Sequence, residues 1–516
     1  VEAFFIPLRL CYGGFQSWFC GEELYNESTR TFTRAAVPVG IIPADISQGS
    51  TSVGLDPSDL NYYFGHSTLT DYLNVKFHYG SSGNIEIPQS EYIQSDGGTI
   101  NGMFVNVFPY IAYHLCYHHY YRNKSIQRPV FAPIDFKGGN YLRQAAHLPY
   151  VANSGLLSVC RGSNVSDLQG SHIVADYLDD GGYYNYSDLL LDGWSLSSLR
   201  QRNYGDDYFT AARPQAQAGD PVQVQTDANG RFTIASLRVQ NAMQEFAEVN
   251  NYATPDYVQT NAARYGVDLS AGIAQKPIIL GSADFPMFTK GVEQTAQSPD
   301  SGIWYSRNPF MQKGIVGATS GRASANGQEF VCDFDVKEPG YIMVMATLVP
   351  EANYGEGVAH DMRIFTGPGS LTDLPCGLLE HVGDEPIYEH ELLIPDSGDL
   401  TRVFGYVQRY LWHKSGGTHE VHGLFRPGQS LEAFVPQRIF LGRSQISSNF
   451  LRIDKTSLDS VASVQYGISQ YGVMLDCAFN FFVSEPLSES ALPSLSNPAI
   501  EHGRSVYLAN GGSKLS

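Results

Sequence analysis

At 516 residues, the chain exceeds the roughly 100–200 residues of an ordinary domain, so it holds either several domains or one core with very long loops. Only 16% of its residues are charged, against about 25% in typical soluble proteins, and 32 are tyrosine. The formal net charge of −19 excludes a general nucleic-acid-binding surface, because such surfaces are basic. A chain so poor in charge and rich in tyrosine is expected to cover much of its surface in an obligate assembly.

The cysteine pattern and the hydropathy bear on the compartment. The seven cysteines are an odd number, are widely scattered and form no CxxC pair, which indicates free thiols in a reducing compartment. The chain shows no signal peptide and no apolar run long enough to cross a bilayer, so we expect a soluble protein without membrane insertion.

The first part of the chain predicts short strands and one helix. Residues 1–10 read as a strand, with Phe4 and Leu8 in the core. Residues 29–44 are strand-like but contain prolines, which favours an edge strand or an extended arm. A proline suits the first turn of a helix over residues 108–123, and apolar or aromatic side chains surround that helix, so we expect it to be buried.

The most metal-like group in the sequence lies on this helix. His114 and His118 are one helical turn apart and could share a zinc ion, but Cys116 lies on the opposite side and cannot complete the ligand set. We interpret these histidines, with His119, as parts of a packed aromatic helix and predict no metal site.

Residues 125–193 are rich in turn residues and show little periodicity. A loop far longer than about 15 residues is normally functional or inserted, so we interpret this stretch as a surface insertion on a β-scaffold. Asp176, Asp179 and Asp180 lack the alternating oxygen spacing of a calcium loop and are interpreted as a solvated acidic loop.

Residues 235–268 predict a pair of helices within a loop. The first helix covers residues 236–249, with apolar positions at helical spacing. The second has Thr254 as its N-cap and Pro255 at its first position, and Gly266 ends it.

The strongest strand signal lies at residues 329–350. Its first arm alternates, with Phe330 and Phe334 toward a core, and a Lys-Glu-Pro-Gly turn follows. The second arm, with Tyr341 and Val344, is apolar almost throughout, as expected of a strand covered on both faces. We predict a hairpin of one half-buried and one fully buried arm within a large β-core.

Later strands are predicted at residues 418–426 and 471–483, the last with Phe479 and Phe481 in the core, and residues 487–516 form an irregular tail. A His-Glu-Val-His run resembles a metalloprotease motif only superficially, because that motif needs HExxH on a helix. The chain contains no nucleophile elbow, P-loop or dinucleotide fingerprint. We predict no catalytic residues, no cofactor and no metal, and hence no enzyme.

Many strands, few helices and long loops argue against an evenly alternating parallel α/β fold. The pattern favours a mainly β protein. We predict an antiparallel β-sandwich of jelly-roll type, with long loop insertions and a few short helices, as a single domain over residues 1–516.

Six stretches resemble, in the same order, motifs of one family, the major capsid proteins of the Microviridae, and in particular its gokushovirus branch. They are FFIPLRLCYGGFQSWFCGEE (4–23), DDYFTAARPQAQAG (206–219), LRVQNAMQEFAEVNNYATPDYVQTNAARYGVDL (237–269), EPGYIMVMATLVPEANYGEG (338–357), VFGYVQRYLWHKSGGTHEVHGLFR (403–426) and DCAFNFFVSEP (476–486).

The resemblance implies that the sandwich is a viral jelly-roll of eight strands. It also implies a capsid protein that self-assembles in the host cytoplasm into a T=1 icosahedral shell of about 60 copies, the virion, around circular single-stranded DNA. Minor virion proteins and a host-cell surface receptor are the further partners it implies. It also implies an insertion that forms protrusions at the threefold axes, for which residues 125–193 and 279–328 are candidates.

Two departures from the family pattern matter. Family members have an N-terminal arm and a first core strand ahead of the first motif. The natural chain is therefore expected to include further residues before Val1. Ala218 stands where the second motif usually has lysine, so DNA contacts are not carried over to single residues. The alternative function is a secreted β-sandwich protein that binds glycans or hydrolyses glycosides, which the odd cysteines and the missing signal peptide disfavour.

Overall fold

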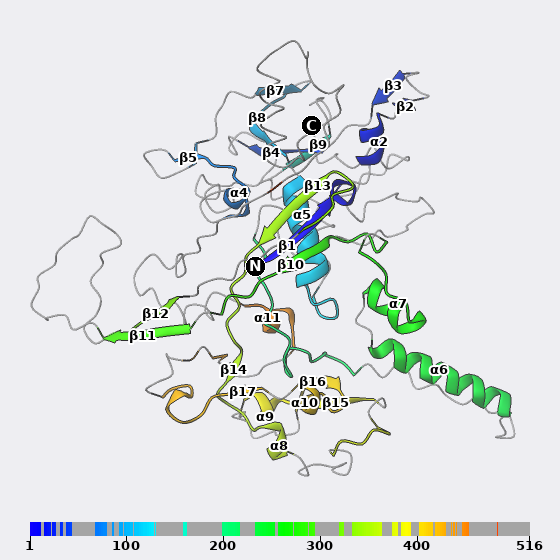
Figure 1. Cartoon of the computed structure of the whole chain (residues 1–516), viewed down its shortest axis with the longest axis vertical. Coiled ribbons are helices and arrows are strands. Elements are labelled where there is room, and N and C mark those ends of the chain that lie inside the picture. Colours follow the sequence, from blue (N-terminus) through cyan, green and yellow to red (C-terminus); the bar gives the residue numbers. More distant parts are fainter. Residues whose placement is uncertain are drawn as a thin grey trace, which may run out of the picture. The chain divides into compact units, whose positions relative to one another are not determined.

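Figure 1 shows the computed structural model of the chain, which divides into two compact units, Val1–Ser463 and Val464–Ser516. The structure describes residues 1–11, 15–21, 23–26, 31–34, 38–43, 68–79, 85–86, 92–95, 98–106, 108–127, 130, 158–161, 199–216, 233–252, 256–271, 273–286, 288–294, 319–324, 333–363, 374–379, 383–393, 402–415, 418–429, 435, 437–438, 440, 446–453 and 482.

The N-terminal strand lies at the centre of a three-stranded antiparallel sheet. β1 (Glu2–Pro7) pairs with β10 (Ile278–Ser282) on one side and with β13 (Gly340–Met345) on the other. The register places Phe4 opposite Met343, and Phe4 is fully buried, as predicted. The sheet therefore joins three segments that are far apart in the sequence.

The predicted hairpin over residues 329–350 is wrong in its partner. The described part of the first arm, residues 333–336, forms no strand, and β13 pairs with β1 instead. Phe334 is half-buried and packs beside Phe5 of β1, with ring centroids 5.0 Å apart. Local alternation cannot identify a partner strand more than 300 residues away in the sequence, because the pairing depends on tertiary contacts.

The second arm of that prediction is not covered on both faces either. Tyr341 and Met343 are partly buried against the first core, and Met345 is buried within it. Ile342, on the other face, is 47% exposed. Val344 shares that outer face and is only half-buried, so its prediction as a fully covered core residue is wrong.

The first hydrophobic core forms around α5 (Phe108–Cys116) and the π-helical turn η1 (Tyr117–Tyr121) that continues it. The predicted buried helix is therefore confirmed. The predicted first strand is shorter than expected, because α1 (Leu8–Cys11) begins where β1 ends; Leu8 is half-buried against this core. The other buried side chains of the core include Phe4, Ile6, Leu10, Cys11, Phe15, Leu69, Tyr110, Ile111, Leu115, Val130 and Met345.

A second hydrophobic core forms around the antiparallel pair β15 (Asp384–Tyr388) and β16 (Val403–Gln408). The helices α9 (Glu389–Leu392) and α11 (Ser448–Leu451) and the short strand β14 (Asn353–Tyr354) contribute to it. Its buried members are Tyr208, Phe209, Ala212, Tyr354, Ile387, Leu392, Phe404, Val407, Ile446, Phe450 and Leu451.

Two helices occupy most of residues 235–268, as the spacing predicts. They are α6 (Ile234–Tyr252) and α7 (Tyr257–Tyr265). Gly266 ends α7 in the left-handed region, with φ of 67°, as expected. The N-cap is Asp256 rather than Thr254, and Thr254 itself lies outside the described residues.

The remaining described sheets are small, and all but one are antiparallel. They comprise β2 (Glu23–Asn26) with β3 (Thr31–Arg34); β7 (Tyr92–Ser95), β8 (Gly98–Val105), β4 (Pro38–Pro43) and β9 (Ser158–Arg161) in that order; β5 (His78–Tyr79) with β6 (Ile85–Glu86); β11 (Phe288–Gln294) with β12 (Thr319–Ser324); and β14, parallel to β17 (His419–Glu420). The short helices are α2 (Phe15–Cys20), α4 (Leu69–Tyr72), α8 (His360–Arg363), α10 (Leu411–Ser415) and a 3-10 turn, Gly423–Phe425.

Several predicted strands and loops agree with the structure only in part. The predicted strand at residues 418–426 shrinks to β17, because the 3-10 turn follows it. Strand β9 lies within residues 125–193, which the sequence predicts as an irregular insertion. Phe330, Phe479, Phe481, most of residues 125–193 and the whole tail 487–516 lie outside the described residues. Among the described helices, none has the length and apolar character needed to cross a membrane.

Candidate functional site

The histidines of α5 and η1 are held by donors from the protein. Arg200 Nε donates to Nδ1 of His114 at 3.0 Å, and the Val130 backbone N–H donates to Nδ1 of His118 at 3.3 Å. A ring nitrogen that accepts an N–H cannot also bind a metal. Across the described ranges, no group of three or more His, Cys, Asp or Glu side chains is placed to hold a metal ion.

A buried polar cluster, the His360 cluster, lies beside the second core. Glu391 Oε2 is 3.1 Å from Nδ1 of His360, and Glu385 Oε1 is 3.4 Å from Nε2. The Arg363 guanidinium pairs with both carboxylates, at 2.8 Å from Glu391 and 3.3 Å from Glu385. The Tyr208 hydroxyl is 3.0 Å from His360 Nδ1 and 3.2 Å from Glu391 Oε2.

Short elements position the His360 cluster. Helix α8 supplies His360 and Arg363, which lie one turn apart, while β15 supplies one carboxylate and α9 the other. Oε1 of Glu391 accepts the backbone N–H of Tyr388 at 3.0 Å, which fixes the start of α9. The His360 ring stacks on Trp412, with centroids 5.2 Å apart. These contacts bind three short elements to one another.

The chemistry of the His360 cluster is structural. Burial, and then the charges of Glu391 and Glu385, raise the pKa of Tyr208 well above its ordinary value, so the phenol stays protonated and serves as a donor. His360 is 3% exposed, which leaves a substrate no access to its ring. Removing one member of such a buried charged group is destabilising, because its partners lose their compensation.

Asp207 organises the turn that leads into the second core. Its Oδ1 accepts the backbone N–H groups of Phe209 at 2.9 Å and Thr210 at 2.7 Å. Its Oδ2 accepts the Tyr354 hydroxyl at 2.7 Å, and Arg438 donates to that hydroxyl at 3.1 Å. Burial and the charge of Asp207 raise the pKa of Tyr354. One carboxylate thus fixes the turn and connects it to β14.

Three of the six stretches that carry the family resemblance meet in this second core: residues 206–219, 338–357 and 403–426. Arg213 and Tyr406 exchange two backbone hydrogen bonds, both of 2.8 Å. Arg426 Nε donates to the carbonyl of Gly355 at 2.9 Å. The motifs are therefore parts of one packed unit rather than separate binding segments.

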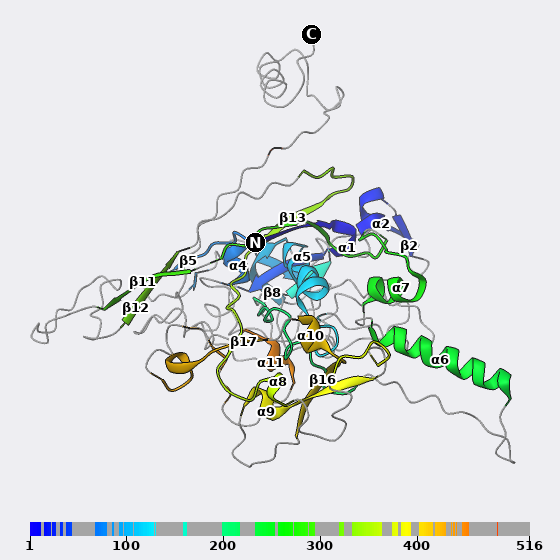
Figure 2. The ribbon, with the colours of Figure 1, turned by 60° about the horizontal axis from the view of Figure 1, so that its bottom comes forward.

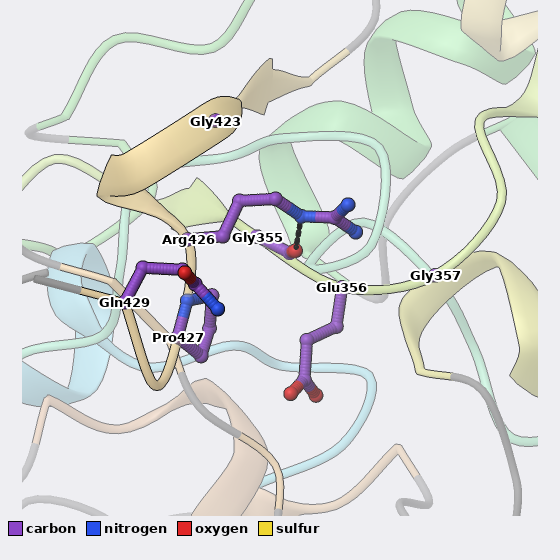
Figure 3. A pocket seen from close by; sticks show the side chains of 7 residues that line it. All are labelled: Gly355, Glu356, Gly357, Gly423, Arg426, Pro427 and Gln429. Carbon is purple, nitrogen blue, oxygen red and sulfur yellow. Dashed lines mark hydrogen bonds between the residues drawn. The ribbon is translucent and has the colours of Figure 1, made fainter.

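A pocket of about 480 Å³ opens beside these packed motifs (Figure 3). Figure 3 shows Arg426 bonded to the Gly355 carbonyl, with the Glu356 carboxylate at another part of the lining. The lining residues are Gly355, Glu356, Gly357, Gly423, Arg426, Pro427 and Gln429. They include no nucleophile with an adjacent base, so the pocket offers no catalytic pair.

Large apolar side chains are exposed on several described elements. Trp18 and Phe19 of α2 are 39% and 63% exposed, and Ile342 of β13 is 47% exposed. Helices α6 and α7 carry more of them, including Phe246 and Tyr265 at 55% and 74%. Single exposed apolar side chains are ordinary, whereas a contiguous group of them marks a surface that contacts another molecule.

Sequence reasoning missed both the His360 cluster and the Asp207 turn. Helices α8 and α9 have four residues each, too few to show a period, and no motif marks their charged side chains. The Asp-x-x-Thr spacing of Asp207 and Thr210 is the usable signal, because an aspartate often accepts the backbone N–H groups two and three residues later.

The comparisons with known proteins point in one direction. The sequence profile of a family described as "Capsid protein (F protein)" matches residues 91–495, which is most of the chain. "Capsid protein VP1" of Chlamydia phage 1 is 23% identical over 305 residues, an alignment that covers 55% of this chain and 46% of the relative. The chain thus spans about half the length of that curated relative.

Proposed function

The chain belongs to the Microviridae phage capsid protein (F protein) family, a family of virion structural proteins and not of enzymes, and from this premise we propose that it is the major capsid protein of a single-stranded DNA phage. The observation that carries the proposal is the family match over residues 91–495. The six motifs in family order, three of them packed in one core, support it.

In this proposal the chain folds as a jelly-roll, an eight-stranded β-sandwich, and about 60 copies form a T=1 shell. The small antiparallel sheets are compatible with such a scaffold. Residues 125–193 would be a surface insertion, residues 235–268 a helical pair in a loop, and residues 487–516 an irregular tail. The low charge and the exposed apolar side chains support a subunit that buries much of its surface against neighbours.

The packaged genome would be circular single-stranded DNA. With a net charge of −19, contact with phosphates must be local, through a few inward-facing basic side chains and aromatic rings that stack on bases. Minor virion proteins and a host-cell surface receptor are the remaining proposed partners.

The test is expression of the full chain, followed by sedimentation and nuclease digestion. The proposal expects the expressed chain to form uniform fast-sedimenting particles. Particles that form in infected cells should in addition protect single-stranded DNA from the nuclease. A stable monomer that binds or cleaves glycans would instead support the secreted β-sandwich alternative, which no feature of the described residues favours.

A further inference from the structure

Helices α6 and α7 carry apolar side chains that the described part of the chain leaves open to solvent. The five on α6 are 43–72% exposed, and the two tyrosines of α7 are 68% and 74% exposed. They are Ile234, Leu237, Val239, Met243 and Phe246 of α6, and Tyr257 and Tyr265 of α7. Contiguous exposed apolar surface marks a contact with another molecule, and on α6 such a surface involves only three of the five, because Ile234 and Leu237 lie on the opposite side of the helix.

Three of these side chains form one stripe along α6. With 3.6 residues per turn, Val239, Met243 and Phe246 fall within about 60° of one another around the helix axis. Arg238 and Glu245, both exposed, lie outside this arc, roughly 80° or more from each of the three around the helix axis. The stripe therefore contains no charged side chain.

Helix α7 extends the stripe into a wider surface. The Arg264 guanidinium lies over the Phe246 ring, 5.2 Å from its centroid. Tyr257 is two turns before Arg264 and shares its side of α7, and Tyr265 is adjacent. Both views show α6 and α7 side by side (Figures 1 and 2). We call the set Val239, Met243, Phe246, Tyr257 and Tyr265 the helical-pair face.

The base of this pair is attached to the first core. Lys124, in the turn that follows η1, forms an ion pair with Asp256, the N-cap of α7. Both side chains are largely buried, at 14% and 17% exposed. This ion pair at the helix N-terminus fixes the orientation of α7 relative to the first core. The exposed tyrosines of α7 therefore have a defined position.

We infer that the helical-pair face binds the same face of a second copy of this chain, related by a twofold axis within the shell. This inference rests on the proposed function, because it names one of the contacts that a shell needs. A twofold contact uses the same patch on both copies, so one apolar stripe supplies both halves of the interface.

The charges favour a second copy over other occupants. A phosphate backbone needs several cations, and the helical-pair face has one beside it, Arg264, whose guanidinium lies over the Phe246 ring. Copies with a net charge of −19 repel each other, and an uncharged stripe lets two copies meet without adding like-charge contacts. Methionine, phenylalanine and tyrosine, which make up most of the face, are the residue types enriched at protein interfaces.

The area is also of the right order. Phe246, Tyr257 and Tyr265 alone expose roughly 300–500 Å², because a large aromatic side chain carries about 150–250 Å². The aliphatic side chains of the stripe add to this. A stable interface buries about 800 Å² on each partner.

The experiment compares the chain of residues 1–516 with two variants of α6. Met243→Glu places a charge in the stripe, and Asn241→Glu places the same charge on the opposite, exposed side of the helix as a matched control. Both positions are exposed, so circular dichroism and the thermal midpoint should match the wild type. Shell formation is measured by sedimentation and electron microscopy.

The expected result is that Met243→Glu lowers the shell yield at least about tenfold, because like charges then face each other across the interface. Asn241→Glu should assemble as the wild type does. If Met243→Glu assembles normally, the inference is overturned while the proposed function stands.

A second measurement separates the inference from the proposed function. The Met243→Cys and Asn241→Cys variants are treated with a bis-maleimide and compared with the wild type, whose Cys20 and Cys376 are exposed. A dimer band specific to Met243→Cys supports the face even if the wild type forms no shell, which would count against the proposed function alone. Equal cross-linking of the two variants overturns the inference.

Discussion

At the scale of single residues, the second core depends on a few polar side chains whose partners lie far away in the sequence. Asp207 accepts two backbone N–H groups and the Tyr354 hydroxyl. His360 sits between two carboxylates that come from different elements. Removing such a side chain destabilises the fold mainly because its buried partners are left without a hydrogen bond. The net contribution of each hydrogen bond itself is smaller.

Replacement of Asp207 by alanine should therefore destabilise the chain. The substitution leaves the N–H groups of Phe209 and Thr210 and the Tyr354 hydroxyl without an acceptor, at a cost of about 1–3 kcal/mol in the free energy of unfolding. Asp206→Ala is the matched control, because Asp206 is exposed, and it should change stability by less than about 0.5 kcal/mol. Urea unfolding of both variants measures the difference, and equal effects would refute the role of Asp207.

The buried tyrosines predict a loss of stability at high pH. Burial, with smaller contributions from Cys116 and Asp256, raises the pKa of Tyr120 to about 12, and burial also raises the pKa values of Tyr121, Tyr208 and Tyr354. The folded chain thus holds these protons more tightly than the unfolded chain, whose tyrosines ionise near pH 10. Their contribution is complete below about pH 10 and, for Tyr120, is lost as the pH rises toward 12.

Urea unfolding between pH 8 and 12, with phenolate absorbance recorded in parallel, tests this. Stability should fall above about pH 10, and the buried phenols should ionise only as the chain unfolds. Full ionisation of all tyrosines near pH 10 in a chain that stays folded would contradict it.

At the scale of elements, the sequence predicts the positions of the helices well and the pairing of the strands poorly. The helices of residues 235–268 and the buried helix α5 follow from apolar spacing and from the Pro109 and Gly266 signals. The partner of β13 does not, because the sheet is closed by β1 from the other end of the chain. The His360 cluster was equally unpredictable, since its short helices are too brief to show a pattern.

The revised pairing of β13 makes its two faces unequal. Met345 is buried against the first core, whereas Ile342 on the outer face is 47% exposed. Met345→Asp should cost about 3–5 kcal/mol in the free energy of unfolding, because it buries an unpaired charge. Ile342→Asp should cost about 1 kcal/mol or less.

Soluble yield and thermal unfolding of the two variants provide the measurement for β13. A strand covered on both faces, as the apolar run alone suggests, would make the variants equally damaging. Similar losses in both would therefore contradict the observed sheet.

At the scale of the whole molecule, the family could be anticipated from the sequence because six motifs keep their order from residue 4 to residue 486. Composition alone indicated only an assembly, through low charge and abundant tyrosine. Which surfaces meet in that assembly could not be predicted, because an apolar stripe such as that of α6 has the same sequence pattern whether it faces a core or a second copy.

The most direct test of the central claim is an electron-microscopic reconstruction of the particles that the chain forms. The capsid proposal predicts icosahedral T=1 shells of about 60 copies, with β1 between β10 and β13 in each subunit. A chain that remains a folded monomer under all assembly conditions, or that forms only irregular aggregates, would contradict it.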